Sequence, residues 1–231
     1  MIMRILIFII SLLIGGSNSF AQETPKSYPE IYGLRVGGDL VKVSRNFWDK
    51  DYKGFEIHAD YRYNKSWYIA AEAGFEERFK SDDQLSFTTS GAFLKIGADR
   101  NFHQNWLDMN NLIYVGARYG LSLHNQTLHS FRVNTGSGYF NEDLQYPELK
   151  SDGLSAHWLE LVFGIKAEIV DNLFLGLNVR FNALIAQKQP EGFENLYYPG
   201  YGQKYSGNIG AGFGYTVSYL IPMKKKIILK D

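Results

Sequence analysis

The residues of this sequence that are most capable of chemistry are charged side chains at every second position of apolar segments. Between residues 55 and 63, Glu56, His58, Asp60 and Arg62 alternate with apolar or aromatic residues without an exception. This period-two pattern is typical of a β-strand that has one polar and one apolar face. Because both signs of charge share the polar face, the chemistry that the pattern indicates is ion pairing.

Three histidines are the other candidates for chemistry. His124, His129 and His157 flank one long connection and could meet near its base. Possible partners for a hydrolase triad lie nearby, at Ser122, Ser130 and Glu160. A hydrolase that modifies lipid A is therefore an alternative function, while solvated loop-base histidines are the simpler interpretation. No pair has a firm metal-ligand spacing, so we predict no metal and no cofactor.

The alternation recurs often enough to predict the whole fold. Eight segments carry it: 34–40, 55–63, 67–76, 92–99, 113–122, 159–169, 175–182 and 208–219. The connections at 63–66 and 171–172 are short, and the connection at 101–111 is intermediate. Long connections occupy 44–53, 77–88, 125–156 and 185–206. We predict an all-β fold, an eight-stranded antiparallel up-and-down transmembrane β-barrel with short periplasmic turns, long outer loops and both termini in the periplasm.

The free-energy cost of exposing charged side chains to lipid predicts which face of each strand points outward. If the polar faces pointed outward, Arg35, Arg62, Arg118 and Arg180 would each cost about 2–4 kcal/mol near the membrane midplane. A soluble lipocalin-type barrel is the competing interpretation, but its outer face would be rich in Lys, Glu and Thr, whereas this polar face is rich in glycine. The polar face is therefore predicted to line the lumen.

Composition excludes several other classes of protein. The chain has 24 basic and 24 acidic residues, so no net positive charge favours nucleic acid. It contains no cysteine, which excludes disulfide scaffolds and thiolate metal sites. A hydrophobic content of 45% is too high for a disordered chain.

The two ends of the chain are predicted to lie outside the barrel. Residues 1–21 have the pattern of a cleaved secretory signal: Arg4, the apolar run 5–14, and a small-x-small site at 19–21. We expect a periplasmic stretch at 22–30, the barrel at 31–221 and a basic periplasmic tail at 222–231. As an alternative to a contact with a protein partner, the basic tail could simply be attracted to lipid phosphates.

The chain resembles the superfamily of small eight-stranded outer-membrane barrels over residues 31–221. In the last segment, Gly212, Tyr215, Val217 and Tyr219 look like the insertion signal that such proteins present to the barrel-assembly machinery. The sequence departs from that signal because 12 residues follow Tyr219. With its IPMKKK segment, the end also resembles an uncharacterised family of Bacteroidetes-type outer-membrane barrels. The likeness implies a fold and a place in the outer membrane of a Gram-negative bacterium, and no activity.

The predicted lumen is too narrow to hold unpaired charges. It would contain eight acids and six bases, and an eight-stranded barrel has room for little beyond its own side chains. Buried charges at this density have to pair, so we predict an ion-paired plug rather than a pore. The expected network consists of Glu56, Asp60, Arg62, Glu72, Lys95, Arg118, Glu160 and Arg180.

The remaining function class is recognition, and two surfaces are available for it. Possible partner contacts on the outer loops are Phe131, Tyr139, Phe140, Tyr197, Tyr198 and Tyr201, with packing of the loops on themselves as the alternative. On the periplasmic side they are Trp106, Lys224, Lys225 and Lys226. We predict a non-enzymatic binding or scaffold component in contact with outer-membrane lipid and lipopolysaccharide. A larger assembly for barrel insertion or protein export is the expected context.

Overall fold

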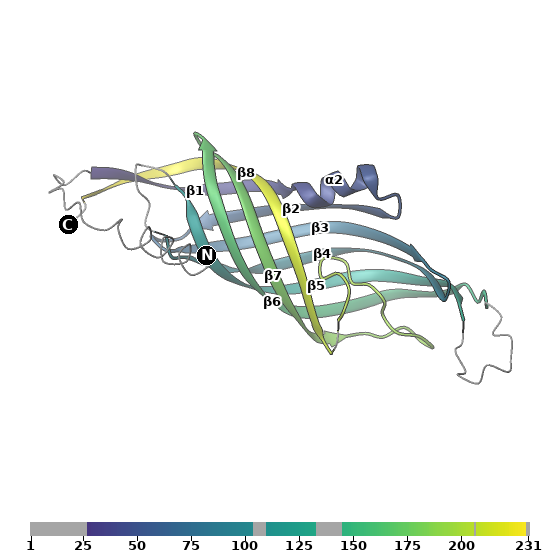
Figure 1. Ribbon diagram of the computed structural model, residues 1–231. Coiled ribbons are helices and arrows are strands. Elements are labelled where there is room, and N and C mark those ends of the chain that lie inside the picture. The colour runs from purple at the N-terminus through teal and green to yellow at the C-terminus, as the bar shows by residue number, and fades with distance from the viewer. Residues whose placement is uncertain (1–26, 104–109, 133–144, 206, 230–231) are drawn as a thin grey trace, which may run out of the picture. The chain divides into compact units, whose positions relative to one another are not determined.

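The computed structural model describes residues 27–103, 110–132, 145–205 and 207–229, and over these residues the chain forms eight strands and one short helix (Figure 1). The strands and the helix are β1 (Ser27–Asp39), α2 (Leu40–Trp48), β2 (Tyr52–Arg62), β3 (Trp67–Ser81), β4 (Leu85–Asn101), β5 (Leu112–Phe131), β6 (Leu149–Val170), β7 (Leu173–Gln187) and β8 (Ile209–Leu229). The strands pair in chain order into a closed barrel. The prediction of an eight-stranded antiparallel up-and-down barrel is confirmed.

The period-two pattern of the sequence separates the two surfaces of the wall. One row of paired residues runs from Ile96 through Tyr119 to Leu159 on neighbouring strands, and all three side chains are exposed on the outside. The adjacent row contains Lys95, which is fully buried in the lumen. The barrel is thus polar inside and apolar outside, the reverse of a water-soluble barrel.

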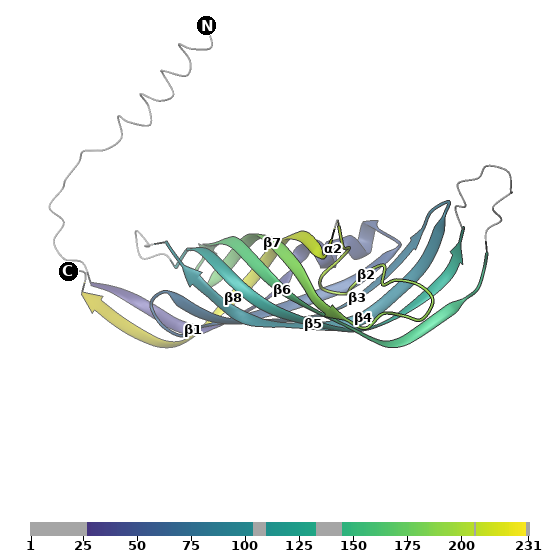
Figure 2. The same cartoon turned by 90° about the horizontal axis from the view of Figure 1, so that it is seen from below.

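The helix α2 was not predicted. The sequence analysis places Leu40 in a strand and 44–53 in a loop, and this is wrong. Asp39 ends β1 by acting as an N-cap: its Oδ1 accepts hydrogen bonds from the backbone N–H groups of Val41 at 2.8 Å and Lys42 at 3.0 Å. The helix lies alongside β2, and Figures 1 and 2 show it following directly from the end of β1.

Several strands are longer than the alternation predicts. The expected long connection at 77–88 is reduced to residues 82–84, because β3 continues to Ser81 and β4 begins at Leu85. The Oδ1 of Asp82 closes this turn by accepting from the N–H groups of Gln84 and Leu85. Strand β5 likewise continues to Phe131, since its inward residue Leu128 packs in a buried apolar cluster. Only the connections 132–148 and 188–208 remain long.

The barrel closes between β1 and β8 by close backbone approach. A Cβ placed on Gly33 would lie 2.2 Å from the backbone oxygen of Ile221, and one on Gly37 would lie 2.1 Å from that of Val217. Glycine is required at both positions, because any side chain would push these strands apart. No helix in the described part of the chain has the length and apolar content needed to cross a membrane.

The ends of the barrel strands extend into the two predicted terminal segments. Strand β1 begins at Ser27, inside the predicted stretch 22–30, and β8 continues to Leu229, inside the predicted tail 222–231. The predicted signal segment, 1–21, lies outside the described residues.

Candidate functional site in the barrel lumen

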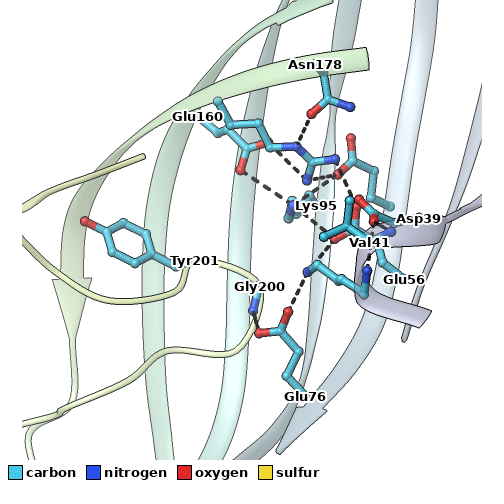
Figure 3. Close-up of polar contacts among 12 residues, drawn as sticks. Asp39, Val41, Glu56, Glu76, Lys95, Glu160, Asn178, Gly200 and Tyr201 are labelled. Atoms are coloured by element: carbon cyan, nitrogen blue, oxygen red, sulfur yellow. Dashed lines mark hydrogen bonds and ion pairs between the residues drawn. The ribbon is translucent and has the colours of Figure 1, made fainter. Parts of the chain in front are cut away.

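A cluster of charged side chains that includes Glu56, Lys95 and Glu160 lies in the lumen (Figure 3). Within it, the Arg180 guanidinium donates from Nη2 to Glu56 Oε1 and from Nη1 to Glu72 Oε2, both at 3.0 Å. Lys95 Nζ lies 3.1 Å from Glu72 Oε2 and 3.4 Å from Glu56 Oε2. Glu160 is held more loosely, 3.6 Å from Lys95 and 3.9 Å from Arg180. Two bases therefore share three buried acids.

We call the end of the barrel with the short turns 63–66 and 171–172 the inner end, and the end with the connections 132–148 and 188–208 the outer end. Arg118 extends the cluster toward the inner end. Its Nη1 lies 2.7 Å from Asp99 Oδ1, and its Nε lies 3.4 Å from Glu72 Oε1. We call the connected set the lumen network: Glu56, Glu72, Lys95, Asp99, Arg118, Glu160 and Arg180. The lumen network contains six of the eight residues that the sequence predicted for it, and it also contains Asp99.

Two of the proposed network residues lie elsewhere. Asp60 forms a separate cluster with Arg35 at 2.9 Å and with Lys166 at 2.5 Å. Arg62 lies at the end of β2, outside the lumen network, so its placement in that network is wrong. Its guanidinium donates to the backbone oxygens of residues 31, 64 and 65, because β2 ends at Arg62 and the side chain folds over the turn that follows.

Helix α2 supplies a base that the sequence analysis missed. Lys42 Nζ lies 2.8 Å from Glu56 Oε2 and 2.6 Å from Glu76 Oε1, so it links the lumen network to the outer end of the barrel. The available signal was Asp39 followed by apolar residues at helical spacing, Leu40, Val43 and Phe47. A base on an unpredicted helix could not be assigned to the lumen from strand alternation.

Very little space is left between these groups. A polar cavity of about 20 Å³ lies beside His58, whose two ring nitrogens have no hydrogen-bond partner in the structure. That volume accommodates about one water molecule. The cavity is walled by charged and aromatic side chains that include Glu72, Tyr114 and Arg180. The inner part of the lumen is filled by the protein.

The outer part of the lumen is filled by the connection 188–208, which folds inward. Tyr198 and Tyr201 are buried against Trp158 of β6, with ring centroids 5.5 Å apart between the two tyrosines and 5.8 Å apart between Tyr201 and Trp158. We call this set the aromatic cluster: Phe93, Ala156, Trp158, Leu184, Tyr198 and Tyr201. Burial raises the pKa of the Tyr198 hydroxyl to about 12, so it stays a neutral hydrogen-bond donor.

The inward loop is held by one carboxylate of β3. Glu76 Oε2 accepts from the Tyr197 hydroxyl at 2.7 Å. It also accepts from the Gly200 N–H at 2.9 Å (Figure 3). Burial and the Glu76 carboxylate both raise the pKa of Tyr197 well above its ordinary value. Gly200 has a positive φ of 80°, and an added Cβ would lie 2.4 Å from the ring of Phe93, so only glycine fits.

The proposal that Tyr197, Tyr198 and Tyr201 contact a partner is therefore wrong, because all three are buried in the barrel. Phe131 also packs against a buried apolar cluster, formed by Phe87, Leu128 and Tyr197. Loop packing, the alternative left open by the sequence, describes these four residues. Of the other proposed contacts, Lys224 is exposed. The side chains of Lys225 and Lys226 are not described, and Trp106, Tyr139 and Phe140 lie outside the described residues.

The residues that resemble an insertion signal lie along β8. Tyr215, Val217 and Tyr219 are on its outward side, and Gly212 is on its inward side. Tyr219 is half exposed.

The three histidines do not meet. His124 points inward, with Nδ1 3.4 Å from Ser122 Oγ and Nε2 3.3 Å from Asn195 Oδ1. His157 bonds the Tyr119 hydroxyl on the outside at 2.7 Å. Among the described residues there is no group of three side chains that could hold a metal ion.

His129 is the centre of a short polar chain on the outer wall. Its Nε2 lies 2.8 Å from the Oγ1 of Thr88, and its Nδ1 lies 3.1 Å from Oε2 of Glu148. Hydroxyl, imidazole and carboxylate thus stand in the order that a hydrolase triad requires, although the hydroxyl is not one that the sequence analysis named.

Comparison with known proteins places the chain in a family. Residues 1–226 match the family described as "Domain of unknown function (DUF6048)". The chain belongs to this family. No curated protein matches it.

The solved structures that are similar to this chain include two proteins of bacteria. Neisserial surface protein A (NspA) aligns with a TM-score of 0.40 and 15% identity, over 86% of this chain and 100% of that chain. Ail, the attachment invasion locus protein of Yersinia pestis, aligns with a TM-score of 0.39 and 10% identity, over 86% of this chain and 99% of that chain.

Proposed function

We propose that this protein is an integral outer-membrane barrel of a Gram-negative bacterium, with a closed interior, and that it acts as a membrane-held binding or scaffold component. The observation that carries the proposal is an apolar outer wall around a lumen filled with paired charges. A channel would need an open interior, and a soluble protein would need a polar exterior.

The outer wall supports the membrane part of this proposal. Strand β3 shows the height of this wall. Between the outward residues Trp67 and Glu77, all outward side chains are apolar and uncharged, beginning with Ile69. Ten residues of tilted strand match the hydrocarbon thickness. Exposed residues on the other strands continue this apolar belt, among them Ile57, Ile96, Leu159, Leu177 and Phe213. In water such a continuous surface would aggregate.

Outward charges reappear where the belt ends. At the outer end, Lys53 and Glu77 form an exposed ion pair at 2.9 Å. At the inner end, Arg100 lies over the rings of Trp67 and Phe102, at 5.9 and 5.1 Å from their centroids. Aromatic residues beside charges are typical of a membrane interface.

The membrane proposal is tested by fractionation and gel mobility. The protein should be recovered with the outer membrane and should show a heat-dependent change in electrophoretic mobility. Recovery as a soluble protein with no heat-modifiable band would contradict the proposal.

The closed interior is tested by recordings in planar bilayers. The reconstituted protein should conduct no steady current, because the lumen network and the inward connection 188–208 leave a cavity for about one water molecule. A steady conductance from the folded protein would show that the interior opens.

The scaffold role is tested by purification in mild detergent. We expect a stoichiometric protein partner, for example a larger subunit for barrel insertion or protein export. We also expect its loss when the chain is truncated from Met223 onward, since Tyr197, Tyr198 and Tyr201 are buried and cannot supply the contact. The truncated protein must keep its heat-dependent mobility. Purification of the intact protein alone would contradict the scaffold role.

A hydrolase that acts on lipid is the second candidate, and one observation favours it, the chain of Thr88, His129 and Glu148. Mass spectrometry of lipid A separates the two functions. If cells with the protein lose an acyl chain from lipid A, and Thr88→Ala and His129→Ala each abolish that loss, the hydrolase replaces the scaffold. His157→Ala is the matched control, because His157 has no carboxylate partner in the structure.

A further inference from the structure

Helix α2 is amphipathic in the opposite sense to a surface helix of a soluble protein. Its polar residues Lys42, Arg45 and Asn46 face the barrel, where each has a polar partner. Phe47 and Trp48 point away from the barrel and are 87% and 68% exposed. An ordinary surface helix buries its apolar side. Nothing in the described part of the chain covers the apolar side of α2.

The helix occupies a place in the wall that a strand would otherwise take. β1 ends at Asp39, beside Gly214 of β8, where an added Cβ would lie 2.8 Å from Asp39 Oδ2. Strand β8 begins at Ile209, so its residues 209–213 extend beyond the last residue of β1. The pairing of β1 with β2 also stops, at Gly38 and Ile57. From there outward, α2 rather than β1 lies beside β2.

Two hydrogen bonds fix the level of the helix against the wall. Asn46 Nδ2 donates to the oxygen of Gly54 at 2.8 Å, and its Oδ1 accepts from the N–H of Gly54 at 2.7 Å. Gly54 lies between Phe55, which is in the apolar belt, and Lys53, which forms the exposed pair with Glu77. The C-terminal part of α2 therefore lies at the outer boundary of the belt.

The charges at the end of the helix are neutralised on the barrel side. Arg45 Nη2 lies 2.8 Å from Asp49 Oδ2, and Arg78 Nη1 lies 2.6 Å from the same oxygen. The Arg45 guanidinium also stacks over the Tyr52 ring at 4.1 Å. The exposed face, formed by Val43, Ser44, Phe47 and Trp48 beside the half-buried Leu40, carries no charge.

We infer that this face of α2 is a lipid-binding surface, seated at the outer boundary of the hydrocarbon layer and covered by the acyl chains of outer-leaflet lipid. The inference rests on the proposed function, because it requires that the barrel spans the membrane. Continuity favours lipid as the occupant: α2 takes the place of a wall strand beside Phe55 of the belt. An uncharged face with Phe and Trp at the headgroup boundary is typical of an interfacial helix.

The absence of cysteine makes a direct test available. We would prepare three single-cysteine variants, Phe47→Cys on the helix face, Phe55→Cys in the belt and Lys50→Cys in the exposed turn after the helix. Each would carry an environment-sensitive fluorophore and would be reconstituted into phosphatidylcholine vesicles that contain lipid brominated near the headgroup end of the acyl chain. Heat-dependent mobility would confirm that each variant is folded.

The labels at Phe47 and Phe55 should both be quenched by the brominated lipid, several-fold more strongly than the label at Lys50, which should respond to iodide in the water. Quenching at Phe55 without quenching at Phe47 would overturn the inference and leave the membrane barrel intact. Loss of quenching at both positions would mean that the proposed function itself has failed. A Phe47 label shielded from both quenchers, with self-quenching that rises with protein density, would identify a second copy as the occupant and also overturn the inference.

Discussion

The inner and outer parts of the lumen are filled in different ways. In the inner part, eight strands surround the lumen network, and long charged side chains reach across it. In the outer part β1 has ended, and the space is occupied by the aromatic cluster and by the polar face of α2. Two glycines on β5 show the difference: a Cβ on Gly116 would lie 2.0 Å from a carboxylate oxygen of Asp99, and one on Gly120 would lie 2.1 Å from the ring of Trp158. The same small residue makes room for a charge in one part and for a ring in the other.

The surrounding elements decide how each part is filled. Where the inward polar faces of eight strands surround the lumen, charges are buried beside opposite charges, whereas beyond the end of β1 the lumen is filled by aromatic rings and by the polar face of α2. Lys42 connects the two parts, since it bonds Glu56 of the network and also Glu76, which holds the inward loop. We therefore expect substitutions in the two parts to have different energetic causes.

The largest effect should come from Arg180→Ala in the inner part. It removes the closest partner of Glu72 and one of the three bases that contact Glu56, and breaking a buried ion pair in this way costs about 3–5 kcal/mol. Lys53→Ala is the matched control, because the exposed pair with Glu77 is worth about 0–1 kcal/mol. Urea unfolding of the refolded protein in detergent measures both. Equal midpoints for the two variants would contradict a paired lumen.

In the outer part, Tyr198→Ala should cost about 3 kcal/mol, since it leaves a cavity in the aromatic cluster and removes a hydrogen bond to Gln187. Tyr205→Ala changes an exposed tyrosine of the same connection and should shift stability by about 0.5 kcal/mol or less. The same unfolding assay compares them. If Tyr205→Ala were the more damaging variant, the connection 188–208 would not pack as described.

A smaller effect is expected where the wall changes from strand to helix. Asn46→Ala removes both hydrogen bonds to Gly54, at about 1 kcal/mol each. Ser44→Ala, on the same helix, is the control, because its hydroxyl bonds only an exposed carbonyl. Hydrogen exchange of the α2 amides should accelerate in Asn46→Ala and stay unchanged in Ser44→Ala. Unchanged exchange in both would show that Asn46 does not hold the helix.

The smallest effect is a dependence on pH at the end of α2. Hydrogen bonds and ion pairing with Arg45 and Arg78 outweigh desolvation and lower the pKa of Asp49 below its ordinary value of 3.8. A carboxyl group with a lowered pKa stabilises the folded state above the unfolded value and loses that contribution as the pH falls through the folded value. The protection of the last α2 amides, measured against their intrinsic exchange rates at each pH, should therefore fall below about pH 4. Asp49→Asn should show faster exchange above pH 4 and no further acid step; an unchanged step would assign the titration to another group.

The strands, their faces and the charge of the lumen could be predicted from local patterns of residues. Alternation is a local property, so Glu72, Lys95 and Arg118 could be assigned to one face without knowledge of their partners. The cost of charge in lipid then predicts that this face lies inward. The same local reasoning failed at Asp39, where a single capping residue changes a strand into a helix, and at Arg62, where a strand end lets the side chain fold back.

Long-range contacts determine which charges meet and what fills the outer part. Arg180 bonds Glu56, 124 residues away in the chain, and this pairing depends on barrel closure and on the inter-strand register. The burial of Tyr198 and Tyr201 depends on the inward fold of the connection 188–208, which no local pattern predicts. Alternation encodes the direction of each side chain, whereas the distance between side chains on different strands is set by the curvature and register of the closed barrel.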